Sequence, residues 1–122
     1  MKRSVGFTNE EAEYLSQNKL GRLATVSRDG TPHVVPVTYE FDGESLYFSG
    51  WNLKKSLKFK NIVINGKAAL VVDDVGTTRG VWAPKGVEIR GNAEVNEDEK
   101  EGTYVKIVPQ KKTSWGFRKN RE

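Results

Sequence analysis

The sequence predicts a mainly β domain, an antiparallel barrel of six strands with two or more short helices. Segments of alternating apolar and polar residues recur along the chain, and only two segments have a helical pattern. Turn signals at residues 28–30 and 42–43 join neighbouring strands by short connections. Six strands within 122 residues are typical of a closed or nearly closed small barrel, so we expect one domain over residues 1–122.

The first half of the chain predicts one helix and a three-stranded meander. Thr8 and Glu11 have the spacing of a capping box, which predicts a helix that ends near Asn18. Strands are expected at residues 22–27, 32–41 and 45–49. Pro36 removes a backbone donor from the second strand, which places that strand at a sheet edge or at a bulge.

The second half predicts a helix at residues 52–62 and three further strands. Leu53 and Leu57 are four residues apart and share one helix face. The strands are expected at residues 68–72, 87–95 and 104–108, with a loop at 76–80. We place the barrel at residues 7–109 and a basic C-terminal tail at 110–122.

Composition excludes several kinds of site. The chain has no cysteine, which excludes disulfides, a thiolate nucleophile, cysteine-ligated zinc and iron–sulfur clusters. His33 is the single histidine, so one chain cannot build a metal site with several histidine ligands, and we interpret it as an ordinary strand residue. No apolar run approaches 18 residues, and no apolar segment follows the first basic residues, so we expect a cytoplasmic protein.

The charge pattern indicates an anionic partner. The net charge is +4, and basic residues cluster at 54–60 and 106–121. Nucleic acid, a membrane surface and a phosphorylated cofactor all fit this balance.

The segment at residues 47–58 is the most informative. A helix N-terminus presents unpaired N–H groups and a partial positive charge, which together suit a phosphate. Lys55 and Lys58 are three residues apart, so both can overhang one point, and Ser49 and Ser56 can add donors. The alternative is a solvated helix face with surface lysines.

Arg22 and the tryptophans each have two interpretations. Arg22 begins a strand of small and apolar residues, where it can bind a phosphate or a ring carbonyl, or pair with an acidic neighbour at the barrel rim. Trp51, Trp82 and Trp115 can stack on a flat ligand, or they can fill a core edge or a dimer contact.

Several segments, in this order and spacing, resemble the pyridoxamine 5′-phosphate oxidase-like, FMN-binding split-barrel superfamily over about residues 7–117. The segments are LGRLATVSRDGTPHVVPV (20–37), DGESLYF (42–48), KFKNI (58–62), NGKAALVVDD (65–74), GVEIRGNAEV (86–95) and IVPQKKTSWG (107–116). The resemblance implies a split barrel that forms a homodimer with the cofactors at its interface.

The resemblance also implies cofactor-binding positions. The first strands and the lysine helix would hold the phosphate, with Lys58 as the basic ligand and Lys55 as a weaker match one turn earlier. The positions implied in all are Arg22, Ala24, Thr25, Val26, Val35, Pro36, Val37, Ser49, Gly50, Lys55, Lys58 and Trp115. Of these, Ala24–Val26 and Val35–Val37 would line the flavin ring with backbone, and Trp115 would lie at the cofactor edge.

Two family features are absent. The Arg-x-His substrate motif of true pyridoxamine phosphate oxidases and the C-terminal histidine of haem-degrading relatives both need a histidine after His33, and there is none. What remains is the short-chain branch that uses FMN or, alternatively, the deazaflavin coenzyme F-420. We therefore expect an oxidoreductase whose cofactor transfers hydride to a small-molecule substrate. The alternatives are a non-catalytic flavin carrier or redox sensor and, less expected, a nucleic-acid-binding barrel.

Overall fold

The computed structural model of the chain describes residues 5–78 and 80–117. The elements are α1 (Asn9–Gln17), β1 (Leu20–Val26), β2 (Pro32–Thr38), β3 (Glu40–Phe41), β4 (Leu46–Phe48), the 3-10 helix η1 (Leu53–Lys55), α2 (Leu57–Ile64), β5 (Lys67–Asp74), β6 (Thr77–Thr78), β7 (Val81–Trp82), β8 (Lys85–Asp98) and β9 (Gly102–Trp115).

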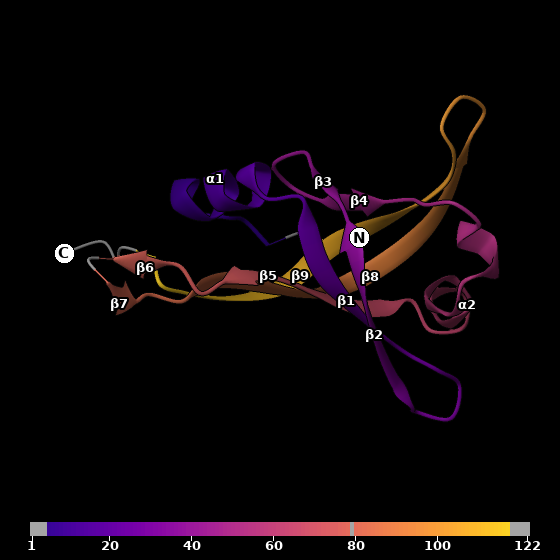
Figure 1. Cartoon of the computed structure of the whole chain (residues 1–122). Coiled ribbons are helices and arrows are strands. Elements are labelled where there is room, and N and C mark those ends of the chain that lie inside the picture. The colour runs from indigo at the N-terminus through magenta and orange to yellow at the C-terminus, as the bar shows by residue number, and fades with distance from the viewer. Residues whose placement is uncertain (1–4, 79, 118–122) are drawn as a thin grey trace.

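Seven of the strands form one curled antiparallel sheet in the order β2-β1-β5-β8-β9-β4-β3. The prediction of a mainly β, antiparallel fold with two helices is therefore confirmed. Figure 1 shows β8 and β9 running the length of the molecule, with α1 near one end of the sheet and α2 near the other. The sheet surface beside α1 is therefore separate from the sheet surface beside α2.

The predicted number of six strands is wrong, because three short strands were not recognised. Residues 76–80, expected as a loop, contain β6, which pairs with β7 in a separate two-stranded sheet. Residues 32–41, expected as one strand, are divided at Tyr39 into β2 and β3. β3, β6 and β7 have two residues each, too few for an alternating pattern to be visible.

Strand β2 lies at an edge of the sheet, as Pro36 predicted. It pairs with β1 over the register Leu20↔Thr38 to Val26↔Pro32 and begins the strand order. Its second edge therefore presents backbone N–H and C=O groups that the sheet does not use.

Residues 110–122 were expected to form a basic tail after the barrel. This prediction is wrong for residues 110–115, which continue strand β9 as far as Trp115. The register with β8 shifts between Arg90 and Gly91, where Arg90 faces Lys111 and Gly91 faces Pro109. Gln110 is thus an extra residue, a β-bulge. The bulge reverses which residues face inward, and this break in the alternation concealed the rest of the strand. Residues 118–122 lie outside the described part.

The predicted helix at residues 52–62 begins later, and the segment before it is a separate turn. Asn52 adopts a left-handed conformation with φ of 57°, and η1 follows it. Ser56 is extended and forms the N-cap of α2, so the α-helix starts at Leu57. A serine that bonds nearby backbone in this way separates two helical turns.

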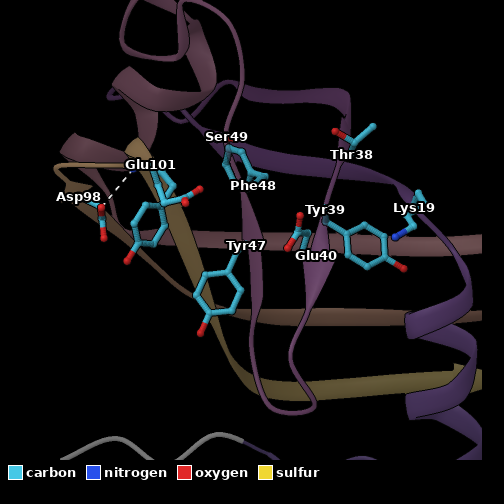
Figure 2. Close-up of a pocket in the computed structure, with 10 residues that line it drawn as sticks. Lys19, Thr38, Tyr39, Glu40, Tyr47, Phe48, Ser49, Asp98 and Glu101 are labelled. Atoms are coloured by element: carbon cyan, nitrogen blue, oxygen red, sulfur yellow. Dashed lines mark hydrogen bonds between the residues drawn. The ribbon is translucent and has the colours of Figure 1, made fainter.

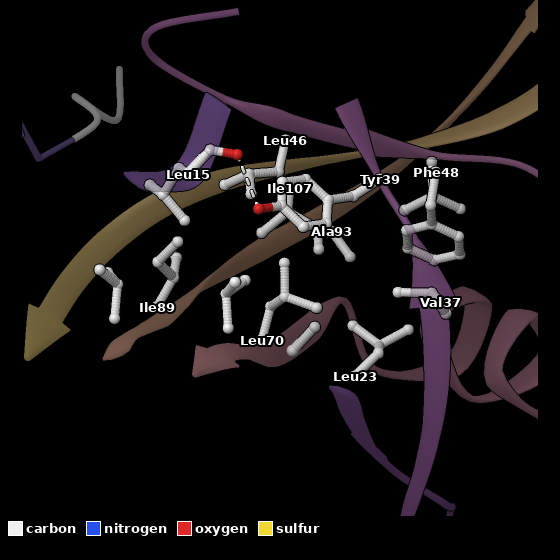
Figure 3. Packing of buried hydrophobic residues seen from close by; sticks show 14 of the residues in the cluster. Leu15, Leu23, Val37, Tyr39, Leu46, Phe48, Leu70, Ile89, Ala93 and Ile107 are labelled. Carbon is white, nitrogen blue, oxygen red and sulfur yellow. Dashed lines mark hydrogen bonds between the residues drawn. The ribbon is translucent and has the colours of Figure 1, made fainter. Parts of the chain in front are cut away.

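The core lies inside the curled sheet, where side chains of its strands meet Leu15 of α1 and Ile62 of α2. Figure 3 shows side chains of this cluster, Leu15 among them. The side chains of Leu23, Leu46, Leu70 and Ile89 come from four different strands and are fully buried, and burying each stabilises the fold by roughly 1.5–3 kcal/mol. The predicted capping box is confirmed, since Thr8 and Glu11 exchange hydrogen bonds of 2.9 and 3.1 Å.

Candidate cofactor site

The segment between β4 and α2 forms one wall of a cavity of about 730 Å³. Ser49, Gly50 and Lys55 lie in this wall together with the exposed Trp51. The opposite wall comes from the β8–β9 hairpin, through Glu101 and Thr103. Three of the predicted cofactor-binding residues are therefore brought together at one cavity.

The first turn of α2 lies directly after this wall. The Ser56 hydroxyl donates to the Leu53 carbonyl at 2.6 Å and accepts from the Phe59 N–H at 3.3 Å, which fixes the start of the helix. Lys58 is half-buried in the first turn, where N–H groups lack helical partners and the helix dipole is positive. The turn contains no acidic residue. This arrangement favours an anion.

The lysines of this segment have different surroundings. Lys54 pairs with Glu97 of the β8–β9 hairpin at 3.1 Å, so its charge is already balanced. Lys55 and Lys58 form no ion pair among the residues that the structure describes. A phosphate at the start of α2 would therefore meet Lys55 and Lys58 as its cations.

A buried hydrogen bond anchors α2 to the sheet. The Asn61 side-chain amide donates to the Thr25 hydroxyl at 3.0 Å, and both side chains are almost completely buried. Asn61 is three residues after Lys58, one helical turn away. The predicted residue Thr25 thus supports the lysine helix through its side chain.

A second cavity, of about 420 Å³, shares Ser49 and Glu101 with the first. Figure 2 shows the residues that line this second cavity. Its other walls come from the end of β2, from β3 and β4, and from the β8–β9 hairpin. The side chains of Glu40, Asp98 and Glu101 line it, against the single cation Lys19. Glu101 lines both cavities, but only the second one adds Glu40 and Asp98, so an anion is expected on the Lys55 side of Ser49.

Tyr47 lines the same acidic cavity. Its hydroxyl donates to Asp42 at 2.7 Å, and this hydrogen bond, with burial and nearby negative charge, raises the pKa of Tyr47 to about 12. Tyr47 is therefore a neutral hydrogen-bonding group at physiological pH.

The predicted ring-lining residues lie elsewhere. Ala24, Thr25 and Val26 line a third cavity, of about 520 Å³, together with Lys67, Arg90 and Gln110. Val35, Pro36 and Val37 lie on β2, and Val37 is part of the core. Only every second residue of β2 turns its backbone N–H and C=O to the free edge of the sheet. Tyr39 donates its N–H to the Lys19 carbonyl, so Val35 and Val37, at the same alternation, also face β1. Pro36 lies on the free edge and offers only its carbonyl there, and the role of these residues at a ring stays a prediction.

Arg22 has the acidic neighbour that one of its two interpretations expected. Its guanidinium donates to Asp73 at 2.5 Å, and both side chains are close to half exposed. The pair joins β1 to β5, away from Lys55 and Lys58. Its role as a cofactor ligand stays a prediction.

Trp115 lies at the end of β9 opposite Gly86, and it is 37% exposed. A Cβ atom at position 86 would lie 2.4 Å from the Trp115 ring, so only glycine permits this contact. Within one chain the ring is thus apart from Lys55 and Lys58. The contact between Trp115 and a cofactor stays a prediction.

Sequence reasoning missed the contribution of the β8–β9 hairpin. Glu101 and Thr103 follow Lys55 by more than 40 positions in the sequence, and nothing local indicates that the hairpin tip reaches η1. The Lys54–Glu97 pair makes the same connection. The left-handed Asn52 beside Trp51 could have been recognised as a turn, since asparagine favours this conformation.

Two negative findings concern the part of the chain that the structure covers. No cluster of three or more His, Cys, Asp or Glu side chains is arranged to hold a metal ion there. None of the helices described is long and apolar enough to cross a membrane.

Comparison with known proteins gives one family match and one close curated relative. The family described as pyridoxamine 5′-phosphate oxidase matches residues 7–117. The 5a,11a-dehydrotetracycline/5a,11a-dehydrooxytetracycline reductase of Streptomyces rimosus is 34% identical over 120 residues, which cover 91% of this chain and 84% of the relative.

Solved structures agree on the fold. The conserved hypothetical protein Rv2991 of Mycobacterium tuberculosis is 23% identical with a TM-score of 0.76, and the match covers 95% of this chain and 89% of that one. A structure described as an F420 reductase is also 23% identical, with a TM-score of 0.70 and coverage of 88% and 98%.

Proposed function

The chain belongs to the pyridoxamine 5′-phosphate oxidase family, and from this premise we propose that it is an oxidoreductase that works with FMN or, alternatively, with the deazaflavin coenzyme F-420. The reductase relative from Streptomyces rimosus supports the reaction class. The neighbour described as an F420 reductase supports the deazaflavin, and the resemblance of the sequence to the FMN-binding split-barrel superfamily supports FMN. The substrate is proposed only as a small organic molecule.

The observation that carries the proposal is the pair of lysines without ion-pair partners at the start of α2. Lys55 lines the cavity, Lys58 lies in the first turn of the helix, and Ser56 caps it. The segment suits a phosphate ester, because Lys55 and Lys58 flank Ser56, and the first turn of α2 carries N–H groups without helical partners. Lys55 lines a cavity of cofactor size, which a bare solvated helix face would not require.

The bound cofactor would supply the hydride chemistry. The chain's residues bind and orient it: Lys55 and Lys58 hold the phosphate, and Ser49 offers a hydroxyl at the end of β4. On the free edge of β2, the Pro36 carbonyl can accept a hydrogen bond from a ring. No side chain need act as an acid or base, which agrees with a single histidine.

We also propose that the protein works as a homodimer. Val34 is 64% exposed on β2, and Trp115 is 37% exposed at the far end of the sheet. A second copy could cover these side chains and bring its own Trp115 to the cofactor, which one chain cannot do. Light scattering is expected to give twice the chain mass of 13.7 kDa. A monomer at micromolar concentration would contradict the homodimer.

The first test is the visible absorption spectrum of the purified protein, alone and after addition of FMN and then of F-420. A flavin-type spectrum, or saturable uptake of one of the two, is the expected result. If neither binds, the proposed function is wrong, and salt-dependent binding of a single-stranded oligonucleotide becomes the next measurement.

A non-catalytic flavin carrier remains the second candidate. It would bind the cofactor equally well, because the same lysines would hold it. The two differ in turnover: an oxidoreductase oxidises or reduces a substrate many times per bound cofactor, whereas a carrier shows no steady-state reaction with any reductant and acceptor pair.

A further inference from the structure

Helix α2 is apolar on its solvent side as well as on the side that faces the sheet. Asn61 and Ile62 are buried on the sheet side. Leu57, Val63 and Ile64 lie on the solvent side, where they are 49, 64 and 48% exposed. Leu57 and Ile64 are seven residues apart, which places them on one helix face. A surface helix normally has polar residues on its outer face, so an apolar outer face indicates a partner.

Basic side chains surround this apolar face. Lys60 is exposed on α2, three residues after Leu57 and four before Ile64, so it lies between them. Arg28, between β1 and β2, and Lys67 of β5 lie near Ile64, since these three residues line one cavity of about 460 Å³. Together these side chains form the α2 patch, which consists of Arg28, Leu57, Lys60, Val63, Ile64 and Lys67.

The charge of the α2 patch is positive and unbalanced. Across residues 5–78 and 80–117, the basic side chains Arg28, Lys60 and Lys67 form no ion pair. The sequence contains no Asp or Glu from residue 45 to residue 72. Asp29 is the acidic residue of the adjoining turn, and its carboxylate accepts hydrogen bonds within that turn. The patch therefore suits an anionic partner.

The composition and size of the α2 patch favour a membrane surface. Apolar side chains with a lysine among them, on one helix face, are typical of helices that lie in the headgroup region of a bilayer. A nucleic acid would pair with the cations but would leave the exposed valine and isoleucine in water. A stable protein interface needs about 800 Å² on each partner, roughly 20 residues or more, which is far more than this patch offers.

We propose that the α2 patch binds the surface of an anionic lipid membrane. The three apolar side chains enter the boundary between headgroups and acyl chains, and the three basic side chains bind lipid phosphates. The contact is confined to the membrane surface, because α2 has only eight residues. Lys55 and Lys58 are not part of the patch, so the membrane contact does not depend on the proposed function.

Flotation of the full chain with lipid vesicles tests the proposal. We expect the protein to float with vesicles of phosphatidylcholine and phosphatidylglycerol in equal parts, and not with vesicles of phosphatidylcholine alone. Binding should fall as salt is added, since ions screen the attraction between the basic side chains and the phosphates. Saturating FMN should leave the binding unchanged, because the patch lies outside the proposed cofactor site.

The apolar half of the patch is tested by the double variant Leu57→Ser/Ile64→Ser. It should weaken vesicle binding at least about tenfold, because two apolar side chains no longer enter the membrane. Val75→Ser/Val81→Ser is the matched control, since it removes two apolar side chains that are exposed near the β6–β7 hairpin. This control should bind vesicles as the unmodified protein does.

The basic half is tested by Arg28→Gln/Lys60→Gln. This double variant should also lose about tenfold or more, since each basic residue near an anionic surface contributes roughly fivefold in affinity. Lys19→Gln/Lys100→Gln removes the same charge from exposed positions elsewhere and should have a much smaller effect. Circular dichroism reports whether each variant is folded.

Several results would overturn the proposal. The protein could bind neither kind of vesicle, or both equally. Loss of binding in Lys58→Ala or with saturating FMN would mean that lipid phosphates occupy the cofactor site instead. Unchanged binding in Leu57→Ser/Ile64→Ser would reduce the contact to a general attraction between charges. A change of oligomeric state in that variant, measured by light scattering, would make the α2 patch a subunit interface.

Discussion

The Asn61 side-chain amide donates a 3.0 Å hydrogen bond to the Thr25 hydroxyl, and this buried contact ties the lysine-bearing helix α2 to strand β1. It fixes the position of the helix turn that begins with Lys58, and so it links the packing of the sheet to the geometry of the proposed phosphate site.

Replacing Thr25 by valine should weaken both stability and cofactor binding. The shape of the side chain is kept, but the Asn61 amide loses its acceptor in a buried place, which costs about 1–3 kcal/mol. Urea denaturation and a cofactor titration measure the two effects. Thr113→Val, at an exposed position of β9, is the control and should change neither. Full stability in Thr25→Val would show that α2 is held by other contacts.

Lys58→Ala should weaken cofactor binding while the fold stays intact. A charged hydrogen bond to phosphate contributes roughly 1.5–3 kcal/mol, equivalent to about a tenfold to hundredfold loss of affinity. Fluorescence titration with the cofactor identified by absorption measures it. Lys60→Ala removes an equal charge from an exposed position on the same helix and should have a much smaller effect. Equal losses of affinity in both variants would mean that Lys58 contributes only its positive charge and makes no specific contact with the phosphate.

Glu11 should make the stability depend on pH in the acid range. Burial alone would raise the pKa of its carboxyl, but hydrogen bonds from Lys112, Ser114 and the Thr8 backbone bring the pKa below its ordinary value of 4.5. The folded pKa is thus lower than the unfolded one. The carboxylate therefore stabilises the fold above about pH 4.5, and this contribution is lost as the pH falls through the folded-state pKa.

Glu11→Gln tests this linkage by urea denaturation between pH 7 and pH 3. At pH 7 the variant should be less stable by a few kcal/mol, since Lys112 loses its charged partner in a largely buried pair. The difference from the unmodified protein should shrink as the pH falls. A constant difference at every pH would mean that the charge of Glu11 does not matter.

Gly91→Ala should destabilise the bulge between β8 and β9. The new methyl group would lie 2.1 Å from the Val108 carbonyl oxygen, a backbone atom that moves only with its strand. Overpacking of this kind costs about 1–3 kcal/mol or more. Thermal unfolding measures the change. Gly6→Ala is the control, because no atom lies within 4 Å of its added carbon. A variant as stable as this control would show that the strands can separate at the bulge.

Short-range chemistry in the sequence was enough to determine much of the fold. Three features depend only on residues that are close together in the sequence: the Thr8–Glu11 capping box, the edge position of Pro36 and the lysine helix with Lys58. The short connections predicted antiparallel pairing, because a tight turn brings the next strand back alongside the previous one in the opposite direction.

The tertiary structure alone decided which distant residues meet. The acidic neighbour of Arg22 is Asp73, 51 positions later in the sequence, and the sequence could not say which acidic residue would lie there. The bulge at Gln110 depends on the approach of Val108 to Gly91 across two strands. Such contacts are set by the register of the sheet and the closure of the curled core, and no local pattern encodes either one.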